Sequence, residues 1–167
     1  MTTIIPEICT PAWAHTAGVI DLQTVAAVPA DFTTLADRAM IQETAARYAV
    51  AYDEGRLDVI KSLMTESTVF SNRVGEGETS SQVGRPVVLK WLGEVMQSQS
   101  DQRRHLLGSL VIERLTADEA TVVTYTAIYG IEREAKLVTT GMYIFKMVKH
   151  DCRWLIDDTL VALDRPF

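Results

Sequence analysis

The sequence predicts an α+β fold in which a curved mixed, mostly antiparallel sheet wraps around three N-terminal helices. The first observation is that helix-like segments fill residues 34–98. The second is that four long segments rich in β-branched and aromatic residues follow residue 102, divided by the short polar turns TADE, EREA and KHD. Helices followed by an antiparallel meander indicate an α+β protein. A strongly curved sheet of this kind would form a cone with a closed apolar interior.

The overall composition indicates a cytoplasmic protein. The chain has 167 residues, enough for one domain with a sizeable core, and its net charge of −6 disfavours nucleic acid and anionic membrane as partners. No apolar run is long enough to cross a bilayer, and the first 37 residues contain no Lys or Arg, so they lack the basic region of a secretory signal. Cys9 and Cys152 are far apart and form no CxxC pair.

Two regions are expected along the chain, an irregular N-terminal extension over residues 1–30 and a single domain over residues 31–167. The extension mixes apolar residues with three prolines and has no clear period. In the domain, Thr34 and Asp37 have the spacing of a capping box, and the first helix is expected to end near Asp53, before a glycine. A second, short helix is expected over LDVIKSLM.

The stretch between the second and third helices is predicted to be flexible. A first strand begins at the residues TVF, and the polar, Gly/Ser-rich sequence SNRVGEGETSSQVG that follows is typical of a mobile loop. Residues 72–83 of this loop could act as a lid. Pro86 then stands in the first turn of the third helix, PVVLKWLGEVMQS, in which Trp91 has the spacing of a core residue.

A carboxylate near the end of the first helix is predicted to point into the protein. With about 100° per residue and Ile41 as origin, Asp53 falls at about 120°, inside the apolar arc, whereas Glu54 falls at about 220°, on the polar side. Negative charge is disfavoured at a helix C-terminus, and a buried charge is costly unless it is paired. The sequence should therefore supply a partner for Asp53.

His105 is the best candidate for that partner, because it is the one histidine in a strong strand segment, RRHLLGSLVIERL. Both faces of this segment are largely apolar, which predicts a central strand and an enclosed imidazole. An Asp–His pair in an apolar cavity can act as a general base, with the carboxylate orienting the imidazole. A purely structural pair remains the alternative. No metal site is expected, since the three histidines are dispersed and form no HxxxH or HExxH motif.

The order of these features resembles the SnoaL-like branch of the nuclear transport factor 2-like superfamily, over about residues 34–163. The features are a helix ending in YDEG, the run DVIKSLMTESTVF, GRP opening a third helix, RRHLLGS on a strand and a meander closing with WLI. Within that superfamily the sequence is most similar to scytalone dehydratase and the bile acid dehydratases. The resemblance implies the cystatin-like cone fold and a pocket lined by Tyr52, Asp53 and His105.

The resemblance is incomplete in the second half of the site. Where those dehydratases carry a second histidine or an aspartate, this chain offers Thr126, and the polar residues of their next strand fall near Gly141 and Tyr143. This puts dehydration in doubt. Isomerases, epoxide hydrolases and polyketide cyclases share the cone with other polar residues, and dioxygenase β subunits share it without catalysis. A common fold cannot choose among these activities.

The leading hypothesis is a lyase or isomerase without a cofactor, acting on a mostly apolar ring compound. His105 would be the base, Asp53 would hold its tautomer, and Tyr52 or Tyr48 would donate a hydrogen bond to a developing enolate oxygen. Thr126 and Tyr143 are predicted to bind the substrate. The alternatives are a non-catalytic ligand-binding or oxygenase-subunit-like protein and a polyketide cyclase. Strands that are apolar on both faces also predict a homodimer or a homotrimer.

Overall fold

The computed structural model describes residues 31–167, and the predicted irregular extension over residues 1–30 lies outside the described residues. The described residues form three helices and six strands, which follow the predicted order except that β2 was not predicted. The elements are α2 (Phe32–Asp53), α3 (Leu57–Leu63), β1 (Met64–Val74), β2 (Ser80–Val83), α4 (Arg85–Ser98), β3 (Gln102–Leu115), β4 (Glu119–Ile131), β5 (Ala135–His150) and β6 (Arg153–Leu163).

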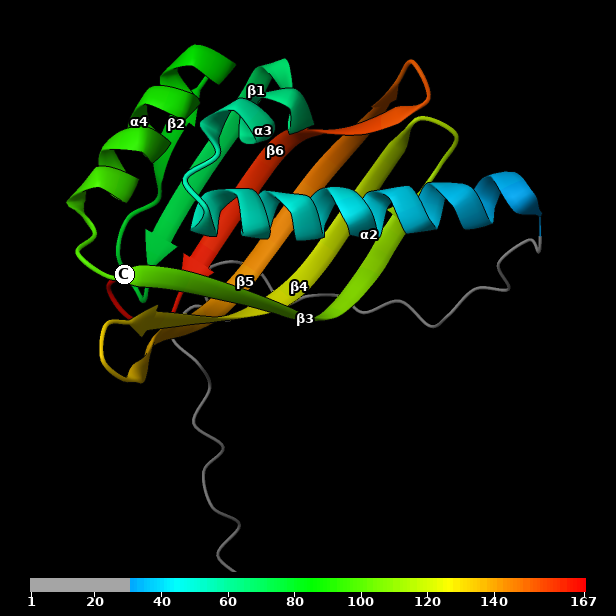
Figure 1. Cartoon of the computed structure of the whole chain (residues 1–167). Helices are drawn as coiled ribbons and strands as arrows, with labels where there is room; N and C mark the ends of the chain where they lie inside the picture. The colour runs from blue at the N-terminus through cyan, green and yellow to red at the C-terminus, as the bar shows by residue number, and fades with distance from the viewer. Residues whose placement is uncertain (1–30) are drawn as a thin grey trace, which may run out of the picture.

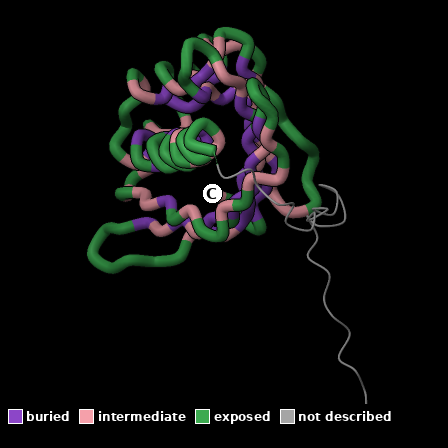
Figure 2. The backbone as a smooth tube through the Cα atoms, turned by 90° about the vertical axis from the view of Figure 1, so that its right-hand side faces the viewer, coloured by how far each residue is buried: buried purple, intermediate pink, exposed green. Residues whose placement is uncertain are grey.

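The six strands form one mixed sheet in the order β2-β1-β6-β5-β4-β3. Only β1 and β6 pair in parallel, and every other neighbouring pair is antiparallel. The helices lie on the concave face, and α2 crosses that face (Figure 1). The α+β class and the curved sheet are therefore confirmed. The expected closure is not observed, because β2 and β3 remain as two separate edges and the sheet stays open around α2 (Figure 2).

The N-terminus of α2 differs from the predicted capping box. The cap is Asp31, whose Oδ1 accepts a hydrogen bond from the backbone N–H of Thr34 at 2.8 Å. Asp37 is instead buried against the sheet, where it accepts a hydrogen bond from Trp154 Nε1 at 3.0 Å and pairs with Lys149 Nζ at 2.7 Å. An acid one turn into the helix thus anchors α2 to the hairpin of β5 and β6.

The predicted lid loop over residues 72–83 is largely a β-hairpin. Asn72 pairs with Ser80 across β1 and β2, and Ser71 Oγ lies 2.8 Å from Ser81 Oγ. Only residues 75–79 connect the two strands, starting at Gly75 with a positive φ of 52°. This serine-rich sequence can form a strand because β2 lies at the edge of the sheet. Its polar side chains and the backbone groups on its outer side can there be hydrated. The lid prediction was therefore wrong.

β3 is an edge strand, whereas the sequence predicted a central one. The apolar side chains on its outer side are exposed, including Leu106 with 59% of its surface accessible. The inner side is covered by the end of α2. Gln102 Nε2 donates to the carbonyl of Asp53 at 2.6 Å, and Arg104 pairs with Glu54 at 3.2 Å. The helix thus encloses His105 although no strand of residues 31–167 lies beyond β3.

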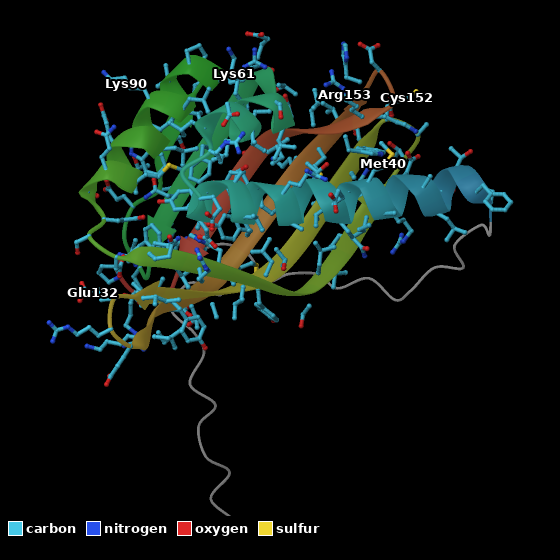
Figure 3. The ribbon with its side chains drawn as sticks, in the orientation of Figure 1. Met40, Lys61, Lys90, Glu132, Cys152 and Arg153 are labelled. Carbon is cyan, nitrogen blue, oxygen red and sulfur yellow. The ribbon has the colours of Figure 1, made fainter. Side chains whose placement is uncertain are left out.

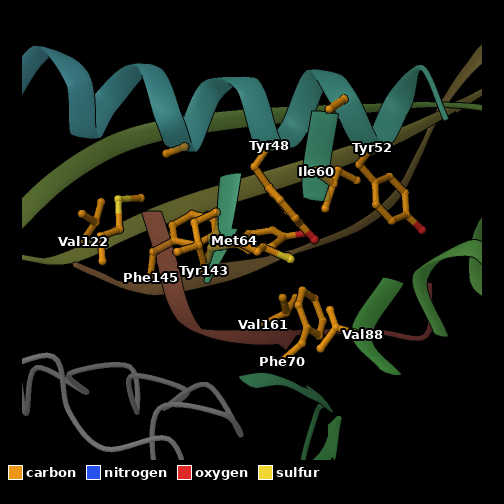
Figure 4. Packing of buried hydrophobic residues seen from close by; sticks show 14 of the residues in the cluster. Tyr48, Tyr52, Ile60, Met64, Phe70, Val88, Val122, Tyr143, Phe145 and Val161 are labelled. Atoms are coloured by element: carbon orange, nitrogen blue, oxygen red, sulfur yellow. The ribbon is translucent and has the colours of Figure 1, made fainter. Parts of the chain in front are cut away.

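The core lies between α2 and the sheet and contains many aromatic rings. Figure 4 shows Tyr48 reaching from α2 toward the rings of Tyr143 and Phe145 on β5. The centroid of Tyr48 is 6.1 Å from that of Tyr143 and 5.7 Å from that of Phe145. The third pair, Tyr143 and Phe145, stacks at 5.4 Å. This aromatic cluster forms the inner end of the space next to His105.

Charged side chains occupy the outer surface of the molecule. Lys61, Lys90, Glu132 and Arg153 all project from the periphery (Figure 3).

Among the described helices, each is too short or too polar to cross a membrane.

Candidate functional site

His105 and Asp53 form a direct, doubly bonded pair. His105 Nδ1 lies 2.5 Å from Asp53 Oδ1, and the backbone N–H of His105 donates to Asp53 Oδ2 at 2.7 Å. One carboxylate therefore binds both the ring and the main chain of the same residue. The predicted contact between Asp53 and His105 is confirmed, and Glu54 points outward as predicted, with 55% of its side chain exposed.

The pair is shielded from solvent by aromatic rings. The side chains of His105 and Asp53 are only 2% and 6% exposed. The imidazole centroid lies 4.8 Å from the ring of Tyr52, 5.7 Å from that of Phe167 and 6.4 Å from that of Tyr143. The ring plane is thereby fixed by packing as well as by Asp53. Within residues 31–167, no hydrogen bond engages Nε2 of His105.

His105 lines a mostly apolar cavity of about 240 Å³. The cavity lies between α2, α4 and the concave face of the sheet. Most of its wall is hydrocarbon or aromatic, and its polar groups come from a few side chains. The lining residues are Tyr48, Tyr52, Phe70, Asn72, Val74, Trp91, Leu92, Val95, His105, Ile128, Tyr143, Val161, Leu163, Pro166 and Phe167. This composition is typical of a site for a small organic molecule.

The three tyrosines of the cavity keep their protons at neutral pH. Burial raises the pKa of Tyr52 to about 12, against the hydrogen bond from Gln99 Nε2 at 2.9 Å, which lowers it. Burial raises the pKa values of Tyr48 and Tyr143 even further, assisted by the neighbouring tyrosines. Their hydroxyls are therefore hydrogen-bond donors rather than bases.

Two polar atoms of the cavity residues are buried without a partner. Tyr48 Oη and Asn72 Oδ1 make no hydrogen bond within the described chain. Buried polar atoms are normally paired, and an unpaired one costs roughly 1–3 kcal/mol. A ligand hydroxyl could donate to Asn72 Oδ1, and a hydroxyl or carbonyl could accept from Tyr48, so these two residues are candidate polar anchoring points.

The structure brings together five of the six predicted site residues. Tyr48, Tyr52, His105 and Tyr143 line the cavity, and Asp53 binds His105 from behind. Thr126 does not line it. This buried residue instead borders a shallow groove beside Leu106 and Tyr125. The alternation of side chains along a strand predicts on which face of the sheet Thr126 lies. It does not predict how far along the strand the cavity extends.

Most of the lining residues were missed by the sequence analysis, and three of them are informative. Asn72 had been assigned to a loop, although it lies on the inner face of β1. Trp91 was assigned to the core, and its ring in fact reaches the cavity and packs 5.2 Å from Phe70. Phe167 is the most distant in sequence, and Arg103 lies 4.6 Å above its ring centroid. The one sequence signal that could have indicated these cavity residues is the apolar character of the segment around Trp91. This signal does not distinguish a cavity wall from a packed core.

The cavity offers no cluster of metal ligands. In residues 31–167, groups of three or more His, Cys, Asp or Glu side chains with a spacing suitable for a metal ion do not occur. Beside His105 and Asp53, the polar atoms of the cavity are hydroxyls and an amide. These groups can position an organic molecule by hydrogen bonding and can move a proton.

Comparison with protein families gives one clear match. Residues 33–159 match the family model of the SnoaL-like domain. A search of curated proteins finds no match.

Solved structures with the same fold carry several functional descriptions. LinA is 18% identical, with a TM-score of 0.70 over 82% of this chain and 93% of LinA. A protein from Novosphingobium aromaticivorans proposed to be a scytalone dehydratase is 19% identical, with a TM-score of 0.66 over 78% and 86% of the two chains. The β subunit of a proposed aromatic-ring-hydroxylating dioxygenase from the same species is 13% identical, with a TM-score of 0.68 over 80% and 92%. At these identities the likeness shows the fold alone.

Proposed function

Because the chain belongs to the SnoaL-like domain family, we propose that it is a dehydratase-like lyase or isomerase that acts without a cofactor on a small, mostly apolar ring compound. One observation carries the proposal. The Asp53–His105 pair stands at the wall of an apolar cavity, with Nδ1 committed to the carboxylate at 2.5 Å. An imidazole held in this way has one remaining nitrogen with which to exchange a proton.

The first chemical step is proton abstraction by His105. With Nδ1–H donating to Asp53, the neutral tautomer carries its lone pair on Nε2, which takes a proton from the carbon next to a carbonyl group of the ring. The C–H electron pair moves to the carbonyl oxygen and gives an enolate. Asp53 holds the ring orientation and stabilises the imidazolium that forms. If the enolate is conjugated with a ring double bond, return of the proton from His105 to the far carbon completes an isomerisation. If a β-hydroxyl is present, the enolate electrons form the new C=C bond and the hydroxyl leaves as water with the proton held by His105, which completes a dehydration.

A tyrosine donates to the enolate oxygen. Tyr52 is the leading candidate, because its ring contacts the imidazole edge-on at 4.8 Å and Gln99 fixes its hydroxyl by donating a hydrogen bond at 2.9 Å. The hydroxyl proton of Tyr52 thus remains available to the substrate. Tyr48 and Tyr143 are donors for a second oxygen, together with Asn72. Preorganised donors of this kind are worth roughly 10²-fold or more in rate.

The volume of the cavity limits the size of the substrate. An apolar cavity of about 150 Å³ accommodates benzene, and this cavity measures about 240 Å³. A single substituted ring or two small fused rings would fill it. The aromatic walls from Phe70, Trp91 and Phe167 favour a flat or unsaturated ring.

Exchange of α-protons in D₂O tests the proposal before the natural substrate is known. A panel of ring ketones, from cyclohexanone and cyclohexenone to tetralone, is incubated with the protein, and α-deuteration is followed by NMR. At least one ketone should exchange faster than in buffer, and His105→Ala should lower that rate by roughly 10² or more. His150→Ala is the matched control, since His150 is an exposed histidine at the end of β5, and it should retain the full rate.

Two results would overturn the proposed chemistry. The first is that no ketone exchanges above the buffer rate, although some of them bind in the cavity. This outcome would favour the non-catalytic ligand-binding role. The second is that exchange continues unchanged in His105→Ala, which would remove His105 as the base.

We also propose that the protein assembles as a homodimer or a homotrimer. The outer side of β3, β4 and β5 carries exposed apolar side chains, among them Leu106, Val111, Tyr125 and Leu137. Several large apolar side chains exposed on neighbouring strands favour an interaction site. A monomeric mass by light scattering at micromolar concentration would contradict the proposal.

A further inference from the structure

Arg73 lies on the opposite side of the sheet from the His105 cavity. Successive residues of a strand point to opposite faces, and Asn72 lines the cavity. Arg73 therefore faces outward, where it borders a separate groove of about 350 Å³ that runs across β1, β6 and β5. The proposed chemistry of His105 does not involve this groove.

Arg73 is a buried cation for which residues 31–167 provide no counterion. It is only 6% exposed, and it is the one buried Arg or Lys of residues 31–167. Its Nε donates to the carbonyl of Gly75 at 3.1 Å, but one of its terminal nitrogens, Nη2, is buried without a partner. No ion pair with a carboxylate of the described chain involves Arg73. A buried charge left in this state is costly.

The other residues of the groove leave the positive charge of Arg73 uncompensated. The Lys146 ammonium and the Asp158 carboxylate lie 2.7 Å apart and neutralise each other. Hydroxyls stand beside Arg73, and aliphatic side chains form the floor. The lining residues are Ser71, Arg73, Thr79, Ile144, Lys146, Asp158, Leu160 and Ala162. The groove thus combines a single net positive charge with hydroxyl donors and an apolar surface.

We propose that this groove binds a small monocarboxylate with a short apolar body. A guanidinium presents parallel N–H donors that match the two oxygens of a carboxylate, and Arg73 is the residue that brings such a group to this groove. The apolar part of the ligand would lie on Ile144 and Leu160. A single negative charge balances Arg73, whereas the second charge of a dianion would find no free cation among the described residues of the groove. The ligand supplies the counterion that residues 31–167 lack.

The test compares butyrate with its neutral isostere butyramide, using the full chain. Butyrate should bind by calorimetry and, at ten times its Kd, should raise Tm by about 3–6 °C. Butyramide should give less than a tenth of that affinity, because it lacks the charge. Equal shifts with both compounds would overturn the proposal. A larger shift with inorganic phosphate than with butyrate would overturn the assignment to a carboxylate.

Arg73→Met assigns the binding to the groove, with Arg153→Met as the matched control that removes an exposed arginine elsewhere. Arg73→Met should abolish the butyrate shift and should raise the Tm of the ligand-free protein by roughly 2 °C or more, because a buried unpaired charge is replaced by an apolar side chain. Arg153→Met should change neither value. If Arg73→Met instead lowers Tm, a carboxylate of the protein itself, from residues 1–30 or from a second copy, already pairs with Arg73 and the proposal fails. Butyrate binding that persists in Arg73→Met also refutes it.

Discussion

Replacement of Asp53 by asparagine should destabilise the protein by about 2–4 kcal/mol. The carboxylate accepts two hydrogen bonds, from the backbone N–H of His105 at 2.7 Å and from its Nδ1 at 2.5 Å. An asparagine of the same shape has one acceptor oxygen, and its NH₂ group would face the second donor. The variant therefore loses one charge-assisted bond, worth about 1.5–3 kcal/mol. It also either leaves the Nδ1–H of His105 facing the amide NH₂ or forces the imidazole into the tautomer that carries its proton on Nε2. The side chains are too enclosed for water to replace the lost bond.

Urea unfolding measures this cost, with Glu54→Gln as the matched control. Glu54 is the adjacent acid, and its ion pair with Arg104 is half exposed, so its replacement should change the free energy of unfolding by less than about 1 kcal/mol. The Asp53→Asn variant should lower the urea midpoint with an unchanged slope. A loss below about 1 kcal/mol for Asp53→Asn would refute the reasoning, since it would mean that the two bonds contribute little.

A double-mutant cycle with His105→Ala separates the two bonds. The backbone N–H of residue 105 remains in the alanine variant, whereas the ring is gone. Asp53→Asn should therefore still destabilise His105→Ala, by roughly 1–2 kcal/mol less than it destabilises the wild type. Catalysis should behave differently, because the double mutant should be scarcely slower than either single mutant.

Two further predictions concern the response of stability to pH. Burial raises the pKa of Asp37, but hydrogen bonds from Lys149 and Trp154 outweigh it and bring this pKa below its ordinary value of 3.8. Asp37 therefore stabilises the folded protein above pH 3.8, and this stabilisation is lost as the pH falls through the lower pKa of the folded state. Asp37→Asn should cost about 1–3 kcal/mol at pH 7, and an acid titration followed by circular dichroism should show the two proteins converge below pH 3.8; a constant difference would contradict this. For Tyr52, burial raises the pKa from 10.0 to about 12, so the folded state holds its proton longer and stability falls as the pH rises from 10 to 12. Between pH 9 and 11, urea unfolding of Tyr52→Phe should lose about 1 kcal/mol less than the wild type, whereas the exposed control Tyr125→Phe should follow the wild type.

The inward direction of Asp53 was predictable because it depends on local geometry alone. The helical period placed Asp53 and Glu54 about 100° apart, and this angle does not depend on what surrounds the helix. The sequence also predicted that His105 is enclosed, but the reasoning behind this prediction was incorrect. Apolar residues on both faces of β3 indicated a central strand, whereas the strand lies at an edge and Leu106 is exposed. Strand order is a long-range property that one strand's composition does not contain.

The errors around β1 and β2 have a different origin. Serine and glycine usually indicate loops, yet Ser80 and Ser81 form a short edge strand opposite Asn72 and Ser71. Pairing with a strong neighbouring strand overrides the weak preference of the serines. Asn72 was missed as a cavity residue for this reason, because its side chain acquires a direction only once the segment is known to be extended.

The position of Asp53 at a helix C-terminus, where negative charge is disfavoured, is explained by what it binds. Its Oδ2 accepts a hydrogen bond from the backbone N–H of β3, which has no further strand beside it within the described part of the chain, and this bond would exist whichever side chain stood at position 105. Asp53 alone is therefore no evidence for catalysis, since docking α2 onto β3 is a sufficient reason for it. The functional evidence lies in the second oxygen. Oδ1 fixes the imidazole so that Nε2 is the nitrogen left without a hydrogen bond in the described chain, in a cavity lined by three protonated tyrosines. Docking of the helix requires no such cavity, whereas proton transfer to a bound ring compound does.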